Sequence, residues 1–137
     1  MQFVAKQFTL GKNERLKSRK QIEQLFTSGQ RFVSPPFRVF YSFQGSQQPA
    51  GTNPLQAGFG ASSRHFKTAV ARNRIKRLAR EAYRLQKNDL QQKLKEQNRK
   101  LNLFFIYTGK ELPAYTDVYK SIQTALSRLL EISIKKF

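Results

Sequence analysis

A row of basic side chains is the densest chemical feature of this 137-residue sequence. Arg72, Lys76, Arg80 and Arg84 recur at every fourth position, so they would lie along one side of a helix. Like charges at this spacing destabilise a helix by about 0.2–0.5 kcal/mol per pair. A polyanion that absorbs the charge is the simplest explanation, in preference to an ordinary solvated face of mixed sign.

The charge of the whole chain points the same way. It has 26 Lys and Arg against 8 Asp and Glu, a formal net charge of +18. Residues 64–84 hold one acid, Glu81, and eight bases: Arg64, Lys67, Arg72, Arg74, Lys76, Arg77, Arg80 and Arg84. This balance predicts a polyanionic partner, with nucleic acid the first choice and an anionic membrane surface the second.

Residues that could carry out catalysis are scarce. The chain has no Cys and a single His, His65, and no two of its eight acids lie within four residues of each other. Catalytic triads need a His, and protein metal sites need clustered carboxylates, His or Cys. The sequence therefore predicts no catalytic residue and no metal site of the protein's own, although acids distant in sequence can meet in a fold.

The basic row is expected on a helix over residues 69–84. A core-facing stripe occupies one arc of about 100° on the helical wheel, and Thr68 is positioned to cap the start of the helix. The stripe consists of Ala71, Ile75, Leu78, Ala79 and Ala82.

Other helices flank this one. A first helix over about residues 19–28 is indicated by a Ser18–Gln21 capping box, and Gly29 would end it by adopting a positive φ. Residues 85–94 continue the helical pattern as a mostly exposed extension. A last helix has an apolar face made of Val118, Ile122, Ala125, Leu126, Leu129 and Leu130.

Three segments read as strands: residues 37–43, 55–62 and 101–108. The last is almost continuously apolar, which is typical of a central strand buried on both faces. Strands mixed with helices in the order α-β-β(-β)-α-β-α predict an α+β fold, a small mixed sheet packed with helices in a two-layer sandwich.

Two strand faces carry possible binding features. Alternation places Arg38 and Phe40 on one face of residues 37–43, where a ring and a cation could hold a base and a phosphate; equally, Phe40 could be core with Arg38 at the edge. Gly58 and Gly60 leave one face of the next strand bare, either for tight packing or for a ligand approaching the backbone.

We expect one RNA-binding domain over residues 1–137, with residues 1–14 as a flexible N-terminal arm. The N-terminus lacks the apolar run of a secretory signal. No stretch approaches the length of a membrane span. Because nucleic acid is the preferred polyanionic partner, no membrane partner is expected.

Residues 71–84, ARNRIKRLAREAYR, resemble the signature of the protein subunit of bacterial ribonuclease P. Residues 15–29, the Gly58–Phe59 strand with the following Ser62, Ser63 and Arg64, the Phe104–Phe105–Ile106 strand and the leucine-rich last helix are also similar to that family. The likeness covers roughly residues 15–133.

The resemblance implies a ribonucleoprotein endoribonuclease that removes the 5′ leader from precursor tRNA in the bacterial cytoplasm. The catalytic groups and Mg²⁺ would belong to a large RNA subunit, and no further protein partner would be required. It also implies that the basic helix lies in an unusual left-handed βαβ crossover, against the general right-handed rule.

The resemblance divides the site residues into two sets. Binding of the RNA subunit is expected at Arg72, Asn73, Arg74, Lys76, Arg77, Arg80 and Arg84, with Arg64 and Lys67 beside them. Binding of the leader is expected at Ile22, Phe26, Arg38 and Phe40, with Arg15 and Lys17 on the approach to the first helix.

Two positions depart from the family pattern. Ile22 stands where members typically have Phe, and it cannot stack as a ring. Lys67 stands where members often have Gly; it would be strained if that position needs a positive φ, and otherwise would add a phosphate contact.

Two other classes of protein share some of these features. A structural RNA-binding protein, such as a ribosomal protein, shares this basicity, and only the signature and the missing catalytic set argue against it. A helix-turn-helix DNA reader is disfavoured because a strand, rather than a helix, precedes Arg64.

Overall fold

Four strands form one mixed sheet in the computed structural model, which describes residues 14–44 and 54–136. The spatial order is β1-β2-β4-β3, with β1 and β4 antiparallel to β2 and β3 parallel to β4. The strands are β1 (Gln30–Ser34), β2 (Phe37–Gln44), β3 (Leu55–Ala61) and β4 (Lys100–Tyr107). The apolar segment near residue 104 is therefore an interior strand, as its sequence predicts.

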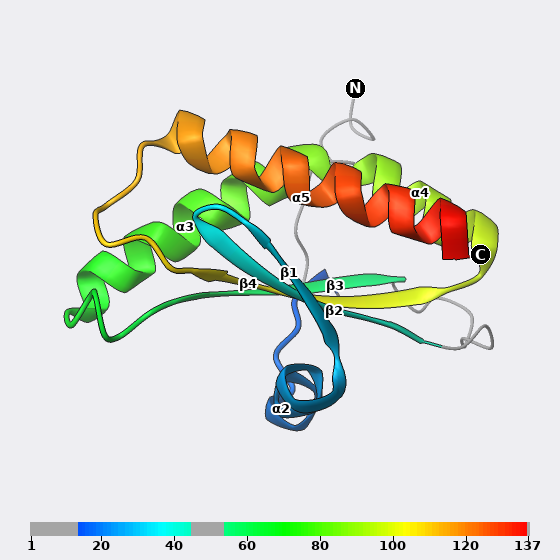
Figure 1. Cartoon of the computed structure of the whole chain (residues 1–137), viewed down its shortest axis with the longest axis horizontal. Helices are drawn as coiled ribbons and strands as arrows, with labels where there is room; N and C mark the ends of the chain where they lie inside the picture. The colour runs from blue at the N-terminus through cyan, green and yellow to red at the C-terminus, as the bar shows by residue number, and fades with distance from the viewer. Residues whose placement is uncertain (1–13, 45–53, 137) are drawn as a thin grey trace.

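Helices cover both faces of this sheet (Figure 1). One face carries α3 (Ala69–Gln86), α4 (Asn88–Gln97) and α5 (Tyr115–Lys136), and the other carries α2 (Arg19–Ser28) alone. The predicted α+β class is confirmed, but α2 adds a third layer to the predicted two-layer sandwich because its apolar side packs on the second face of the sheet. The α2 helix adds a second, smaller apolar cluster on the far side of the sheet from the main core.

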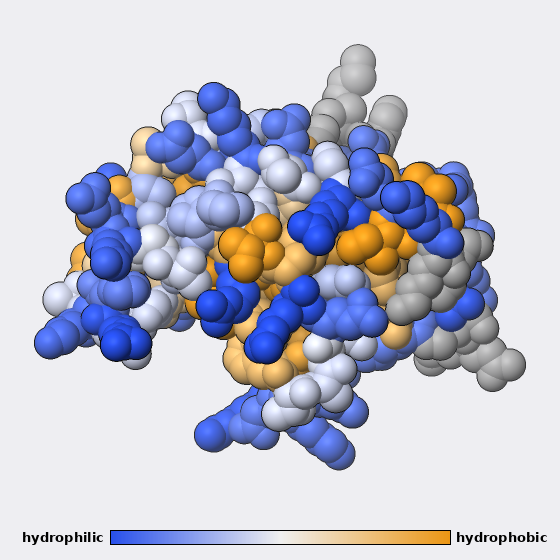
Figure 2. Space-filling model, in the orientation of Figure 1, coloured by the Kyte–Doolittle hydropathy of each residue, from blue (hydrophilic) through white to orange (hydrophobic). Residues whose placement is uncertain are grey.

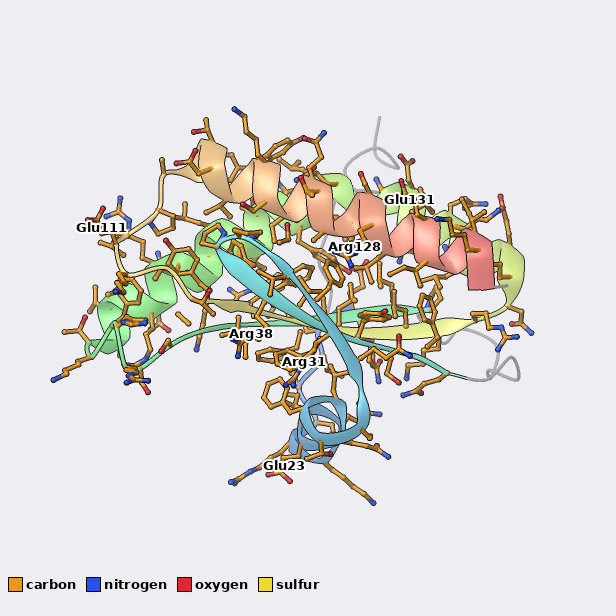
Figure 3. All side chains as sticks on the ribbon, in the orientation of Figure 1. Glu23, Arg31, Arg38, Glu111, Arg128 and Glu131 are labelled. Carbon is orange, nitrogen blue, oxygen red and sulfur yellow. The ribbon has the colours of Figure 1, made fainter. Side chains whose placement is uncertain are left out.

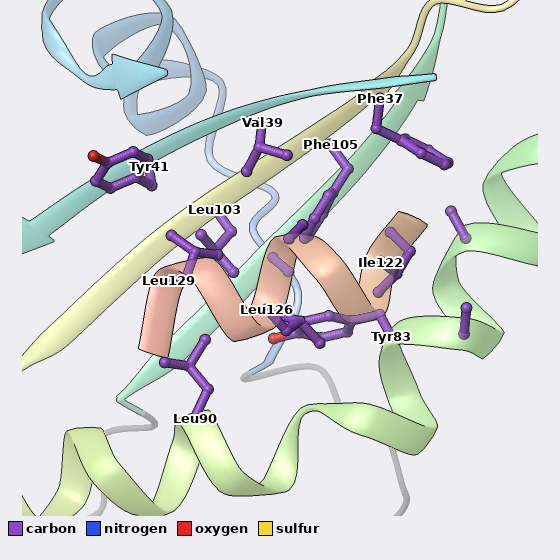
Figure 4. Close-up of a cluster of buried hydrophobic side chains, with 14 of the residues drawn as sticks. Phe37, Val39, Tyr41, Tyr83, Leu90, Leu103, Phe105, Ile122, Leu126 and Leu129 are labelled. Atoms are coloured by element: carbon purple, nitrogen blue, oxygen red, sulfur yellow. The ribbon is translucent and has the colours of Figure 1, made fainter. Parts of the chain in front are cut away.

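The main core lies between the sheet and the three helices (Figure 4). Phe37, Val39 and Tyr41 alternate into it from β2, as predicted. Phe105 of β4 stacks on Phe59 of β3, with ring centroids 5.5 Å apart and planes inclined by 8°. The alternate residues of the same strands face α2.

The α3 helix is fixed to this core by the predicted stripe. Ile75, Ala79 and Ala82 are buried and Ala71 and Leu78 are partly buried against the cluster. Tyr83, on the same side of the helix, is also fully buried. The basic side chains of α3 are thereby turned away from the core.

The two predicted N-caps are confirmed, whereas the predicted conformation of Gly29 is wrong. Ser18 Oγ accepts a hydrogen bond from the backbone N–H of Gln21, and Thr68 Oγ1 accepts one from Ala71, as expected of N-caps. Gly29 does not adopt a positive φ: its φ is −75°. A Cβ there would lie 2.4 Å from the carbonyl oxygen of Leu25, so lack of space requires glycine at this position.

The segment after α3 also differs from expectation. It forms a separate helix, α4, rather than a mostly exposed extension, because Leu90 and Leu94 are buried in the main core. The α3 and α4 helices together connect β3 to its parallel neighbour β4. This is the predicted βαβ unit, and its left-handed sense stays a prediction.

Most of the expected N-terminal arm, residues 1–13, lies outside the described residues. Its last residue, Glu14, is buried and forms an ion pair with Lys87. None of the helices within residues 14–44 and 54–136 is long and apolar enough to cross a bilayer.

Candidate RNA-binding surfaces

The outward side of α3 carries the predicted cations, and we call this set the α3 basic face. Asn73, Arg74 and Arg77 are exposed, and the other members are half-buried. The members are Arg72, Asn73, Arg74, Lys76, Arg77, Arg80 and Arg84. Because Glu81 is the only acid in the helix sequence, the face keeps a strong excess of positive charge.

Glu81 neutralises only the last turn of this face. Both oxygens of its carboxylate accept from the Arg84 guanidinium, Nε to Oε2 at 3.0 Å and Nη2 to Oε1 at 2.5 Å. This pairing lowers the pKa of Glu81 and raises the pKa of Arg84. Of the predicted binding residues on α3, Arg84 is therefore already engaged by a carboxylate.

Arg72 links the α3 basic face to the loop before it. Its Nη1 donates to the carbonyl oxygen of Phe66 at 2.6 Å. The loop is further folded by the Phe66 N–H, which donates to the Ser62 carbonyl oxygen at 3.1 Å. This arrangement places the exposed Arg64 and Lys67 beside the start of α3, as predicted.

The departure at Lys67 carries no backbone strain. Among the described residues other than glycine, only Asn98 has a positive φ, so Lys67 does not need the conformational freedom of glycine. Its exposed ammonium group extends the α3 basic face by one cation.

Arg15 lies near α3 rather than among the other expected leader residues. The segment around it runs parallel to β3, with an Arg15–Ala57 bridge and a hydrogen bond from Leu16 N to Ala57 O of 2.9 Å. Successive side chains of an extended segment point to opposite faces, so Leu16 enters the α2 side and Arg15 turns to the α3 side. Burial first, and then the charges of Arg15 and Arg77, lower the pKa of Arg80.

A second surface lies where α2 meets the sheet, and we call it the α2 aromatic cluster. Phe26 packs on Phe40 with ring centroids 4.8 Å apart and on Phe104 at 5.1 Å, the latter edge to face. Ile22 and Ile106 are half-buried against the same group. In Figure 2 an apolar surface lies between the sheet and α2, with hydrophilic side chains around it.

The rings of Phe26 and Phe40 differ in how far a ligand can reach them. Phe26 is 38% exposed, whereas Phe40 is 6% exposed beneath it. Phe26 thus presents its ring at the surface, and Phe40 supports it from the sheet. The structure brings three of the predicted leader residues, Ile22, Phe26 and Phe40, into this one cluster.

Phe104 explains the two glycines of β3. A Cβ on Gly58 would lie 2.6 Å from Phe104 Cδ2, and one on Gly60 would lie 3.1 Å from Cε1. The Phe104 ring therefore occupies the bare strip that these glycines leave. Of the two alternatives considered for the glycines, the structure shows tight packing, by a ring of the neighbouring strand.

Cations surround the α2 aromatic cluster on the sheet. Arg38 is exposed and pairs across the strands with Val33 and Ile106, and exposed Arg31 pairs with Phe40. Figure 3 shows Arg31 and Arg38 on the α2 side of the sheet. Lys17 is exposed just before α2.

Sequence reasoning missed three residues of this surface: Arg31, Phe104 and Ile106. The two-residue alternation of β4 would assign Phe104 and Ile106 to this face, but the nearly continuous apolar sequence of that strand hides the difference between its faces. No local pattern would assign Arg31, because its place depends on the register of the β1–β2 hairpin.

The described residues do not fit a metal centre. No three or more of their Asp, Glu, His or Cys side chains come together in a group that could hold an ion. We therefore assign no Mg²⁺ ligand within residues 14–44 and 54–136.

Comparison with known proteins gives one family. The family model described as ribonuclease P matches residues 10–130. A ribonuclease P protein component of Porphyromonas gingivalis is 37% identical over 122 residues, covering 89% of this chain and 87% of the relative. One from Chlorobaculum tepidum is 30% identical, covering 88% of this chain and 82% of the relative.

Solved structures have the same fold. The ribonuclease P protein of Staphylococcus aureus at 2.0 Å superposes with a TM-score of 0.64 at 17% identity, covering 85% of this chain and 94% of that one. A second structure of the S. aureus protein gives a TM-score of 0.52 at 21% identity, covering 91% of this chain and 92% of that one. With a family match that spans most of the sequence, this chain belongs to the ribonuclease P protein component family.

Proposed function

We propose that this chain is the protein subunit of a bacterial ribonuclease P, which removes the 5′ leader from precursor tRNA in the cytoplasm. Its two surfaces would have separate tasks: the α3 basic face binds the catalytic RNA, and the α2 aromatic cluster binds the leader. The observation that carries the proposal is the unbalanced positive charge on α3 in a chain of this family.

The α3 basic face suits a folded RNA backbone. Arg74 and Arg77 are exposed on consecutive turns, and Arg64 and Lys67 extend the charge past the start of the helix. A planar guanidinium can contact a phosphate through two N–H groups. The crowding of Arg80 with Arg15 and Arg77 would be relieved by phosphates placed between them.

The α2 aromatic cluster suits single-stranded RNA. The exposed ring of Phe26 offers a surface on which a base can stack, while Arg38 and Arg31 lie on the sheet face that carries Phe40 and would contact phosphates. Ile22 supplies an apolar wall without a ring, so stacking in this protein would depend on Phe26. Lys17, at the approach to α2, adds one more cation to the path of the leader.

Chemistry would be carried by the RNA subunit. Hydrolysis of the phosphodiester needs charge stabilisation and an activated water, which RNA-bound Mg²⁺ supplies. The role of the protein is then to bind and orient RNA, and no further protein subunit is needed for it.

Reconstitution tests the proposal. At low Mg²⁺, adding this protein to a bacterial ribonuclease P RNA should raise the rate of precursor tRNA cleavage. No stimulation at any Mg²⁺ concentration would contradict it.

Co-purification separates this function from that of a structural RNA-binding protein. The proposal expects a single RNA of a few hundred nucleotides to accompany the protein from cells. Recovery with ribosomal particles instead would favour a ribosomal role.

A further inference from the structure

Residues 14–18, which we call the N-terminal strap, run from the junction of α3 and α4 to the start of α2. The strap follows the outer edge of β3, where Arg15 bridges Ala57 and the Leu16 N–H donates to the Ala57 carbonyl oxygen at 2.9 Å. Leu16 is buried on the α2 side of the sheet, and Ser18 caps α2. The strap is therefore fixed to both β3 and α2.

Glu14 fixes the other end of the strap through an ion pair with Lys87, the residue between α3 and α4. Lys87 is 1% exposed and Glu14 is 9% exposed. The loss of hydration offsets most of the attraction in such a pair, so an apolar pair of similar size would often stabilise a fold as well. A buried ion pair does restrict its two segments to one arrangement, because either charge left alone in the interior is strongly unfavourable.

The ion pair holds Arg15 beside α3. Because Leu16 enters the α2 side of the sheet, the Arg15 side chain lies on the opposite side, where α3 packs on β3. Burial first, and then the charges of Arg15 and Arg77, lower the pKa of Arg80, as expected if the three cations lie close together. Arg15 thus extends the α3 basic face from a segment that is distant in sequence.

Arg15, Arg77 and Arg80 form a cluster of cations from two segments of the chain. None of the three forms an ion pair with a carboxylate of the described residues. Arg15 and Arg77 are exposed and Arg80 is half-buried, so an anion can reach the cluster. A guanidinium group binds phosphate through paired N–H donors, and a phosphate among the three would offset their mutual repulsion.

We propose that Arg15 contacts a phosphate of the catalytic RNA rather than of the leader, and that the buried Lys87–Glu14 pair positions it for this contact. The inference rests on the proposed function and adds two positioning residues to it. Lys87 and Glu14 are buried, so they act on RNA binding through the strap and not by touching RNA.

The first test measures binding of the full chain to a bacterial ribonuclease P RNA, without tRNA, over a range of salt concentrations. Arg15→Ala should weaken binding about fivefold at physiological ionic strength and make the slope of log affinity against log salt shallower by about 0.7–0.9, the value for one phosphate. Because Arg15 is exposed, this variant should remain folded. Arg19→Ala, at a 93% exposed side chain of α2, is the matched control and should keep the slope.

A second test separates the catalytic RNA from the leader. Holoenzyme reconstituted with Arg15→Ala should keep the full preference of the unmodified holoenzyme for precursor tRNA over mature tRNA. Loss of this preference, with unchanged affinity for the catalytic RNA, would place Arg15 on the path of the leader and overturn the proposal.

A double-mutant cycle tests the positioning role of the ion pair. Lys87→Met keeps the length of the side chain but lacks the ammonium group, so Glu14 would turn to solvent and release the strap. Lys87→Met should make the salt slope shallower by the same amount as Arg15→Ala, and the two substitutions together should have no further effect. Additive effects, or an unchanged slope in Lys87→Met, would overturn the positioning role.

Hydrogen exchange gives a measurement that does not depend on RNA. In Lys87→Met the Leu16 amide should exchange about tenfold faster relative to the amides of β4, because the strap opens while the sheet stays folded. Equal acceleration of both would show a general loss of stability and no positioning. Should Lys87→Met fail to fold, Lys87→Met combined with Glu14→Gln takes its place, since Met cannot donate a hydrogen bond to the strap.

The phosphate contact is overturned if Arg15→Ala binds the catalytic RNA with the affinity and salt slope of Arg19→Ala. Failure of the proposed function would appear separately, as no stimulation of cleavage by the unmodified protein.

Discussion

Phe26 of α2 lies over Phe40 of β2, with ring centroids 4.8 Å apart and planes inclined by 57°. The contact joins a helix to the sheet face opposite the main core, and it leaves Phe26 partly in solvent. One ring of the pair is therefore structural by position, and the other is available to a ligand. The predictions for this surface follow from that division.

Phe26→Ala should weaken binding of leader-bearing precursor tRNA by about 1–3 kcal/mol, the value of one base stack. Binding of mature tRNA should change little, because it has no leader. Phe26→Leu is the matched control, since it keeps an apolar contact with Phe40 and Phe104 but has no ring. Equal losses for both RNAs in a filter-binding titration would show that Phe26 is only structural.

Arg74→Ala and Arg77→Ala should each weaken binding of the catalytic RNA and reduce its salt dependence. For each phosphate that the variant no longer neutralises, the slope of log affinity against log salt should become shallower by about 0.7–0.9. Lys120→Ala removes an exposed cation from α5 and serves as the control. The Lys120 variant should keep the slope of the unmodified protein. If the Arg74 and Arg77 variants keep it too, α3 is not the phosphate-binding helix.

Gly58→Ala should disturb the α2 aromatic cluster more than Gly60→Ala. The new Cβ at 58 would lie 2.6 Å from the Phe104 ring and 3.2 Å from the Leu16 carbonyl oxygen, whereas the one at 60 has 3.1 Å to the ring. Overpacking of this kind costs about 1–3 kcal/mol. Urea denaturation should therefore rank Gly58→Ala as the less stable variant, and the opposite order would refute the packing explanation.

Tyr83→Phe should reduce the loss of folding stability at alkaline pH. Burial, and then the charge of Glu14, raise the pKa of Tyr83 well above its usual value of about 10. Above about pH 10 the unfolded chain loses this proton and the folded chain keeps it, so stability falls as pH rises. The stability that the protonated Tyr83 hydroxyl contributes is complete below about pH 10. It is lost as the pH rises toward the pKa of Tyr83 in the folded state.

The same substitution should not destabilise the protein at neutral pH. Tyr83 OH has no hydrogen-bond partner among the described residues, so Phe removes an unsatisfied group and should gain up to about 1 kcal/mol. Urea unfolding at about pH 7 and about pH 10.5, on either side of the usual tyrosine pKa, measures both effects. A large loss at neutral pH would mean that the hydroxyl is paired.

Local patterns in the sequence are sufficient to predict α3. Its stripe has the period of a helix, and Thr68 caps it through a contact three residues away, so neither feature depends on the rest of the fold. The same holds for the two faces of β2. Alternation along the strand assigns Phe40 to the correct face of the sheet. It does not predict how deeply Phe40 is buried, because that depends on the packing of Phe26 from α2.

Long-range contacts account for what the sequence could not show. The need for glycine at positions 58 and 60 is explained by the Phe104 ring that packs against them. Phe104 belongs to a strand that is distant in the chain but adjacent in the sheet. Because Arg15 and Lys17 are close in sequence, both are predicted to bind the leader. The bridge between Arg15 and Ala57 instead turns the Arg15 side chain toward α3. Lys87 would be read as exposed from its residue type, yet it is 1% exposed.

Loss of one partner of the Lys87–Glu14 ion pair should strongly destabilise the folded state. Lys87 Nζ donates to Glu14 Oε1, and Gln91 Nε2 lies 3.4 Å from the same oxygen. Lys87→Ala would leave a buried carboxylate without its cation, a change that costs about 3–5 kcal/mol.

The double variant Lys87→Met with Glu14→Gln removes both charges and should recover much of that loss in urea denaturation. Since Glu14 adjoins Arg15, Lys87→Ala should also weaken binding of the catalytic RNA under conditions where the protein stays folded. If the single and double variants are equally unstable, the pair contributes packing rather than charge compensation.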